Sequence, residues 1–429
     1  MKKLLSLLVC VLLGAPLVGC RDDADDIETK KTQTTQQKTR IALDEAVENA
    51  LMFISELEEC ETGATRAVGR RFASVEYVTS KETSTTCATR SVTSDEGNAD
   101  TLLYLINYAD NGGFALMPAD RRLDAVYALS NEGSLSMSDT TYNKGLAMVM
   151  NSIRRNLSIP PIPFKPEPDI PEDKIQLYRS VARKINTNVA KWGQSTPYNQ
   201  ACPIDGSNGE RSVVGCGPLA CAIITSYYEY PTQFENTSIA WSHIKSGDTT
   251  EIATLAQYLH WLGEPQRLAA FYGSPGGLWG GTSIYDGNII PAFNNIGYQD
   301  VDSDTTLFSL YDRLQNQPVL ISANGPDGNG HVWVIDGAKE YVRYSYLSPE
   351  ISNVEDITPG YYYNGVAYRL YHCVWGWYGK CNGYFRIEDW RDAEFNLSDG
   401  QDSVDSDEDV HSANLSFDRN YNLFYGFSN

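Results

Sequence analysis

Two residues of this chain have side chains suited to nucleophilic catalysis, a cysteine and a histidine that both follow glycine. Cys216 lies in VVGCGPLACAII, ahead of an apolar run that predicts a buried helix. Pro218 fits the first helical turn, where the backbone N–H has no partner within the helix. A thiol at a helix N-terminus has a lowered pKa, which favours the thiolate. We therefore interpret Cys216 as a candidate nucleophile, although free cysteines more often simply pack, as we expect of Cys221.

The candidate base is His331, in NGPDGNGHVWVIDG, where a glycine-rich loop leads into an apolar strand. A side chain at the edge of such a strand can face a cleft. The other histidines fit structural or solvated roles better. His260 is expected to be partly packed, His372 lies within a strand, and His411 follows an acidic tract. Taken singly, none of these residues identifies an active site.

Length and composition limit the functions to consider. The chain has 429 residues, enough for two domains, and 42% of them are hydrophobic. Its formal charge of −21 argues against nucleic-acid binding, which requires clustered Lys and Arg. No CxxC motif or Cys/His ligand cluster occurs in the sequence, so we expect no structural zinc.

The first residues predict export. Residues 1–19 have the charged start and short apolar core of a signal peptide. LVGC, which ends at Cys20, resembles a lipobox and implies a lipid on Cys20, while ordinary signal-peptidase cleavage is the alternative. Residues 20–40 are polar and repetitive, as in a flexible tether. We expect an outer-membrane or cell-surface lipoprotein whose only membrane contact is this lipid.

Residues 41–158 predict a compact α+β unit. LDEAVENALMFISELEE has apolar residues at helical spacing. Two β-rich runs flank Asp110-Asn111-Gly112-Gly113, a strong hairpin signal. DAVYALS predicts a third strand and TYNKGLAMVMNSIRR a second helix. This unit holds no cluster of catalytic residue types.

Residues 159–184 predict a boundary between two domains. The segment contains a proline-rich run, which is expected to be extended and exposed. Arg179, Arg183 and Lys184 follow in a segment that we expect to be accessible, a candidate site for proteolytic activation. A plain interdomain linker explains the same composition equally well.

Residues 185–429 predict a second α+β domain with two lobes. PLACAIITSYYEY is apolar around most of its circumference and predicts a central buried helix. The later runs QPVLISA, HVWVIDGA, AYRLYHCVWGW and GYFRIEDW predict an antiparallel sheet. The acidic tract 398–410 predicts a solvated loop, with calcium binding as a weaker alternative.

An ordered set of motifs resembles the streptopain-like cysteine peptidases of the papain clan. WGQ at 192–194, PYN, VGC, a helix ending in YYEYP, LGEPQRLAAFYGSPGG, GHVWVIDG and WGWYG occur in the family's order over most of 190–395. The resemblance implies a two-lobed papain-like catalytic domain over 185–429. Residues 41–158 resemble the family's inhibitory prodomain, and 159–184 would contain the activation cleavage.

The resemblance also implies roles for individual residues. Cys216 would be the thiolate nucleophile of a cysteine endopeptidase made as a zymogen, and His331 would protonate the leaving amine. The side chain of Gln194 and the backbone N–H of Cys216 would form the oxyanion hole, and Trp375 would cover the His331 side of the site. Protein or peptide substrates and the chain's own prodomain are the implied partners, with no metal or organic cofactor. An apolar side chain is implied for P2, the second substrate residue before the scissile bond.

Val374 departs from the family, which usually has Asn at this position to orient the imidazole. Either a backbone carbonyl replaces the amide, or activity is reduced, or the pair is arranged differently. The alternatives are therefore an inactive papain-fold lipoprotein that binds peptides or proteins, and an amidase acting on cell-wall peptides. Cys373 and Cys381 bracket the WGWYG turn and fit either a disulfide or free thiols.

Overall fold

The computed structural model describes residues 39–63, 69–79, 83–86, 100–158, 174–278, 280–324, 330–345, 362–387 and 421–428. The predicted signal peptide, the lipidation at Cys20, the tether, the proline-rich run, the acidic tract and His411 lie outside these residues. Within the described ranges, no helix has the length and apolar character needed to cross a bilayer.

The first region, residues 41–158, is called the N-terminal module below. It contains α2 (Leu43–Thr62), β1 (Phe72–Thr79), β2 (Thr83–Thr86), β3 (Thr101–Tyr108), β4 (Phe114–Pro118), β5 (Ala128–Ser130), η1 (Met137–Thr141) and α3 (Lys144–Ser158). The predicted hairpin is confirmed, because β3 and β4 pair antiparallel across a turn in which Asp110 and Asn111 have positive φ. Both predicted helices and the third strand are confirmed as well.

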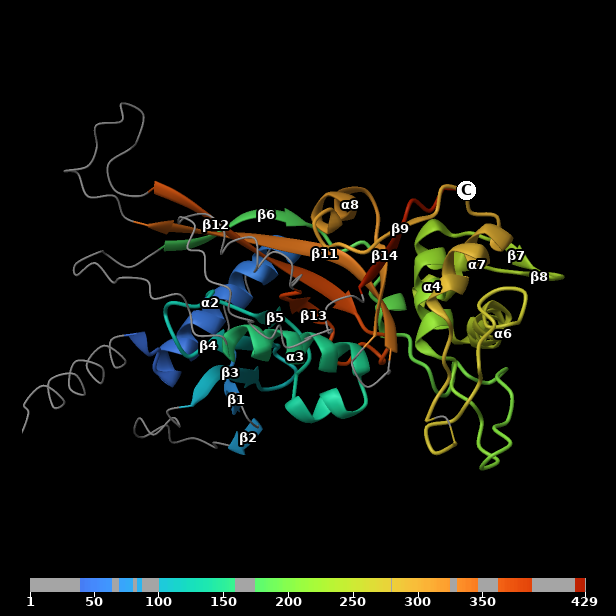
Figure 1. The fold of residues 1–429 in the computed structure, drawn as a ribbon, viewed down its shortest axis with the longest axis horizontal. Coiled ribbons are helices and arrows are strands. Elements are labelled where there is room, and N and C mark those ends of the chain that lie inside the picture. The colour runs from blue at the N-terminus through green and yellow to red at the C-terminus, as the bar shows by residue number, and fades with distance from the viewer. Residues whose placement is uncertain are drawn as a thin grey trace, which may run out of the picture. The chain divides into compact units, whose positions relative to one another are not determined.

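The second region, residues 174–428, is called the C-terminal module. Its helical elements are η2 (Val189–Lys191), α4 (Cys216–Tyr228), α5 (Trp241–Ser246), η3 (Thr249–Glu251), α6 (Ile252–Leu262), η4 (Asp286–Asn288), α7 (Ile289–Ile296) and α8 (Leu310–Asn316). Its strands are β6 (Lys174–Val181), β7 (Gln233–Phe234), β8 (Thr237–Ser238), β9 (Asp302–Asp304), β10 (Val319–Asn324), β11 (Gly330–Ser345), β12 (Tyr362–Val374), β13 (Gly383–Phe385) and β14 (Asn422–Tyr425). Helix α4 is buried from Gly217 to Ser226, as predicted, and contacts β11 (Figure 1).

The two modules share one antiparallel sheet. Its order is β2-β1-β3-β4-β5-β13-β12-β11-β10-β14-β9, and β6 pairs with β11. The junction between modules is short, with Tyr384 opposite Leu129 and Phe385 opposite Ala128. The predicted α+β class is confirmed, and the continuity of the sheet is a feature that the sequence did not indicate.

The basic segment before residue 185 is exposed, as predicted, but its backbone belongs to the sheet. Residues 174–181 form β6, which pairs along β11, and Arg179 and Arg183 are exposed. Arg179 forms an ion pair with Glu340, and Arg183 forms ion pairs with acidic side chains of the N-terminal module. The backbone pairing limits cleavage within β6, because a strand that is hydrogen bonded along its length cannot extend into a protease cleft.

Two hydrophobic clusters lie on opposite sides of β10 and β11. We call them the shared cluster and the helix-side cluster. Trp333 and Ile335 belong to the shared cluster, which both modules build. Val332 and Val334 alternate with them and face the helix-side cluster around α4, whose members all come from the C-terminal module. A third cluster lies under α2.

Candidate active site

The backbone around Cys216 leaves little room for other residues. Cys216 is the first residue of α4, and Gly215 before it has φ of 90°. A Cβ on Gly215 would lie 2.8 Å from Thr282 Cγ2, and one on Gly217 would lie 2.3 Å from Ile284 Cδ1. The two glycines therefore allow the segment 282–284 to pack directly against the start of the helix.

The surroundings of Cys216 favour the neutral thiol in this structure, contrary to the lowered pKa expected from its place at a helix N-terminus. Burial raises the pKa of the Cys216 thiol, and the backbone N–H groups of Val332 and Gly217 offset part of this effect. The negative charge of Asp286 adds to the rise. Cys221 is fully buried in the helix-side cluster, which confirms its packing role, and burial raises the pKa of its thiol.

Gln194 lies beside the cysteine loop, in a segment fixed on both sides. The backbone N–H of Val214 donates to the Gln194 carbonyl over 2.8 Å. Tyr378 packs so closely over Gly193 that a Cβ there would lie 2.4 Å from the Tyr378 ring. The Tyr378 hydroxyl accepts from the Ser195 N–H at 2.9 Å. This segment therefore holds Gln194 buried next to the loop that leads to Cys216.

The His331 imidazole points into the shared cluster. It is buried, stacks on Trp333, and donates from Nε2 to the Trp375 carbonyl oxygen at 3.1 Å. Because a carbonyl oxygen can only accept, Nε2 carries the proton and Nδ1 is the acceptor. Burial lowers the pKa of His331 to about 4, despite the opposing effect of this hydrogen bond. The imidazole is therefore neutral near pH 7.

Trp375 and its neighbours explain how the site is built without the family's Asn. Trp375 is fully buried, and its indole N–H donates to the Cys381 carbonyl at 2.9 Å. Its backbone N–H donates to Asn382 Oδ1, and Asn382 Nδ2 donates to the Ala190 carbonyl. Val374 points the other way, into the helix-side cluster. Of the alternatives raised by the sequence, a backbone carbonyl occupies the orienting position.

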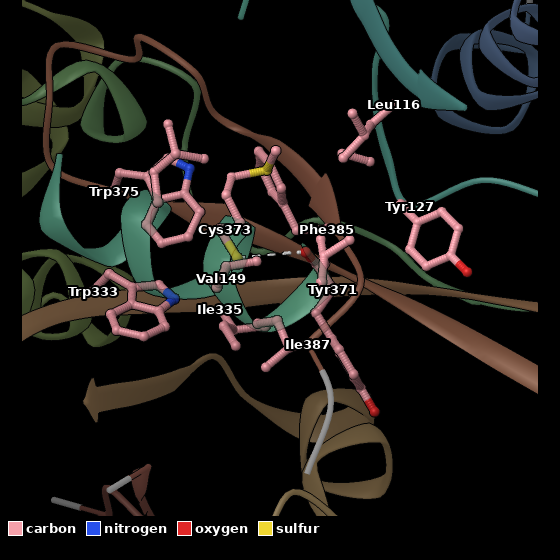
Figure 2. Packing of buried hydrophobic residues seen from close by; sticks show 14 of the residues in the cluster. Leu116, Tyr127, Val149, Trp333, Ile335, Tyr371, Cys373, Trp375, Phe385 and Ile387 are labelled. Carbon is pink, nitrogen blue, oxygen red and sulfur yellow. Dashed lines mark hydrogen bonds between the residues drawn. The ribbon is translucent and has the colours of Figure 1, made fainter. Parts of the chain in front are cut away.

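Cys216 and His331 are not paired in this structure. Among the described residues, no hydrogen bond or ion pair joins the thiol to the imidazole. Helix α3 of the N-terminal module packs on His331 instead: a Cβ on Gly145 would lie 2.5 Å from His331 Cδ2 and 2.9 Å from Trp375 Cζ3. Figure 2 shows Trp375 and Trp333 in the shared cluster together with Val149 of α3.

The remaining candidates have structural positions. His372 Nδ1 contacts Asp336 Oδ1 at 2.6 Å, and both side chains are buried. Asp336 Oδ2 accepts from the Ile185 N–H at 2.9 Å, which anchors the chain after β6. His260 stacks on Tyr272 and is partly packed, as predicted.

Cys373 and Cys381 are buried free thiols. Nowhere in the described ranges do three or more His, Cys, Asp or Glu side chains gather as a metal site.

A polar network joins the modules next to these residues. Glu61 of α2 accepts hydrogen bonds from the Tyr384 hydroxyl at 2.9 Å and from Asn131, and it pairs with Arg183 at 3.2 Å. A cavity of about 680 Å³ lies beside the network, between the modules, and includes Arg183 and His372 in its lining. Neither Cys216 nor His331 lines this cavity, so it is separate from the candidate active site. Sequence reasoning missed the network because its members are far apart in the chain.

Two family models match the two modules separately. A model of the peptidase C10 family matches residues 192–267 and 294–385, and a model of the Spi protease inhibitor family matches residues 29–157. A solved fragment of Prevotella intermedia prointerpain A is 19% identical, with a TM-score of 0.46, over 76% of this chain and 96% of the fragment. Active interpain A cysteine protease from the same organism is 20% identical, with a TM-score of 0.38, over 58% of this chain and 96% of that one. No curated protein matches.

Proposed function

The chain is a streptopain-like cysteine peptidase with a prodomain, and from that premise we propose that Cys216 and His331 form its catalytic dyad. The peptidase C10 match includes Gln194 and Cys216 in its first segment and His331 and Trp375 in its second. The observation that carries the proposal is the packing of α3 against His331. A prodomain that covers His331, the general base, blocks the reaction and leaves the Cys216 loop unchanged.

Catalysis proceeds through a thioester. Cys216 Sγ attacks the substrate carbonyl carbon after its proton passes to His331, and the imidazolium then protonates the leaving amine. Water hydrolyses the thioester with His331 as base. The Gln194 side chain and the Cys216 backbone N–H stabilise the oxyanion, and one such donor contributes roughly 3 kcal/mol in the transition state. The Trp375 carbonyl fixes the tautomer by accepting from Nε2, which leaves Nδ1 to exchange protons with sulfur.

The N-terminal module keeps the enzyme latent. While α3 is in place, His331 is neutral, stacks on Trp333 and packs against α3, with no hydrogen bond to the Cys216 thiol. Cleavage between the modules, followed by departure of α3, would open that side of the imidazole. His331 could then turn towards Cys216 and form the thiolate–imidazolium pair.

Casein cleavage by the full chain lacking residues 1–20 tests the proposal, beside its Cys216→Ala form. We expect the parent to shorten itself, with a new N-terminus between residues 159 and 191, and to cleave casein. We expect the variant to do neither, with a loss of about 10³-fold or more. If neither form cut casein after an added protease removed the N-terminal module, the peptide-binding alternative would replace this proposal.

We also propose that the peptidase is exported and anchored by a lipid on Cys20. The charged start, the short apolar core and the LVGC sequence support this proposal. Expression in a Gram-negative host with radiolabelled palmitate should label the parent chain in the membrane fraction. A Cys20→Ser variant that kept its label and its membrane location would contradict the anchor.

A further inference from the structure

One carboxylate lies beside the candidate nucleophile and belongs to none of the roles above. Asp286 begins η4, two residues after Ile284, whose side chain covers the Gly217 backbone. Its charge is near enough to raise the pKa of the Cys216 thiol. A negative charge near the sulfur disfavours the thiolate. We therefore expect Asp286 to have a function that outweighs this effect on Cys216.

The Asp286 carboxylate is held between the two walls of the site. Its Oδ2 accepts a hydrogen bond of 2.6 Å from the hydroxyl of Ser322, which is buried in β10. Ser322 is paired with Val332 of β11, and the Val332 N–H lies at the Cys216 sulfur. The carboxylate therefore lies in a corner formed by the segment 284–286, the start of α4 and the strands β10 and β11.

This carboxylate has no positive partner in the described part of the chain. No Lys, Arg or His side chain there forms an ion pair with Asp286, and Ser322 is its hydrogen-bond donor. The side chain is half-buried, so water screens it less than a surface carboxylate. A half-buried carboxylate beside the proposed nucleophile attracts a cation, and a bound substrate can bring one.

We propose that Asp286 forms the end of the P2 subsite and selects substrates with Lys or Arg at that position. This inference rests on the proposed peptidase function and replaces the apolar P2 side chain that the family resemblance implies. A substrate cation would pair with the carboxylate and offset its effect on the Cys216 thiol. The adjacent Tyr285 ring is 70% exposed, which leaves it available to contact the aliphatic part of a Lys or Arg side chain.

Peptides that differ only at P2 test the assignment. The enzyme obtained from the full chain after removal of the N-terminal module is given fluorogenic peptides with Arg, Lys, Leu or citrulline at P2. Citrulline has the shape of Arg without its charge. We expect kcat/KM for Arg to exceed that for citrulline by about 30-fold or more, and the ratio to shrink at high salt.

The variant Asp286→Asn keeps the side-chain shape and should bring the Arg-to-citrulline ratio close to one. The matched control is Asp312→Asn, which removes the same charge from the exposed face of α8 and should keep the ratio of the parent. A parent ratio near one would overturn the inference and leave the peptidase function standing. A variant that slowed both peptides equally and shifted the pH profile would also overturn it, in favour of Asp286 as a partner of His331.

Binding measurements keep the inference testable if the processed chain hydrolyses nothing. Calorimetry on the Cys216→Ala form, after an added protease has removed its N-terminal module, compares the affinities of the Arg and citrulline peptides. About tenfold tighter binding of the Arg peptide supports the P2 assignment, and equal affinities overturn it. Absence of hydrolysis in the parent then counts against the proposed function alone.

Discussion

The proposed nucleophile, Cys216, and the proposed base, His331, lie in regions built in different ways. Cys216 is placed by α4 and the helix-side cluster, all of whose members come from the C-terminal module. His331 is placed by the shared cluster, to which α3 and β5 of the N-terminal module contribute. The surroundings of Cys216 are therefore complete within the C-terminal module, whereas those of His331 include part of the N-terminal module.

The difference indicates that the N-terminal module inhibits the enzyme at His331 and not at Cys216. The cysteine loop has no room for change, since Thr282 and Ile284 pack against its glycines. The imidazole, by contrast, contacts α3, which we propose is lost on activation. Because the N-terminal module packs on His331, it can inhibit the enzyme without straining α4. Its release would then restore the site without refolding α4.

The strongest test of this comparison uses pH. Burial lowers the pKa of His331 from 6.5 to about 4, so between these values the unfolded chain binds more protons than the folded one. The free energy of unfolding of the full chain should therefore fall as pH falls from about 6.5 to about 4. The shift corresponds to about 3 kcal/mol. Urea titrations of the Cys216→Ala chain across this range measure it.

A His331→Gln variant of the same chain should lack this part of the pH dependence. The matched control is His243→Gln, which removes a histidine with 65% of its side chain exposed and should keep the slope of the parent. Identical slopes in all three chains would mean that His331 is not the buried neutral base described here.

The second test changes the contact between α3 and the imidazole. Gly145→Ala adds a Cβ that would lie 2.5 Å from His331 Cδ2, so α3 must move away. We expect the N-terminal module to be released sooner and self-processing of the full chain to accelerate by about 10- to 100-fold, equivalent to about 1.4–2.7 kcal/mol. Time courses of the cleavage on gels measure the rate.

Helix propensity makes this test sharper, because Ala in a helix is favoured over Gly by about 1 kcal/mol and would alone slow the release. The matched control is Gly69→Ala, where a Cβ would meet nothing within 4 Å. Slower processing in Gly145→Ala than in the parent would show that the contact between α3 and His331 does not control release of the N-terminal module.

The third test weakens the module junction at a distance from the imidazole. Glu61→Gln keeps the side-chain shape but removes the charge that pairs with Arg183 and weakens the bond to Tyr384. We expect processing to accelerate by about 3- to 10-fold, because a partly buried charged hydrogen bond contributes about 1–2 kcal/mol. Glu59→Gln, on the exposed face of α2, should process at the parental rate. Equal processing rates for both variants would mean that the polar network around Glu61 does not help to keep the enzyme latent.

The sequence predicted the parts of the molecule that carry a local signal. The apolar run after Cys216 predicted α4, and the turn at residues 110–113 predicted the β3–β4 hairpin. The junction β5–β13 could not be predicted, because each of these strands has three residues and pairs with a partner far away in the chain. The packing of α3 on His331 could not be predicted either, because α3 and β11 are far apart in the chain.

Val374 shows how a motif can mislead when the structure supplies the same contact in another way. Its side chain is fully buried, opposite Val334, in the helix-side cluster. The imidazole Nε2 already donates to the carbonyl of the following residue, Trp375. An amide introduced at residue 374 would therefore face apolar side chains instead of the imidazole.

We accordingly expect Val374→Asn to change kcat/KM of the activated enzyme by less than about threefold, the smallest effect on activity in this series. Its cost should appear in stability, because a buried amide without partners lowers the free energy of unfolding by about 1–3 kcal/mol. Val334→Asn is the matched control, since it places the same amide on the same face and should cost a similar amount. A tenfold rise in kcat/KM for Val374→Asn alone would mean that the activated site turns its imidazole towards residue 374, and that the surroundings of His331 are rebuilt on activation instead of simply being released.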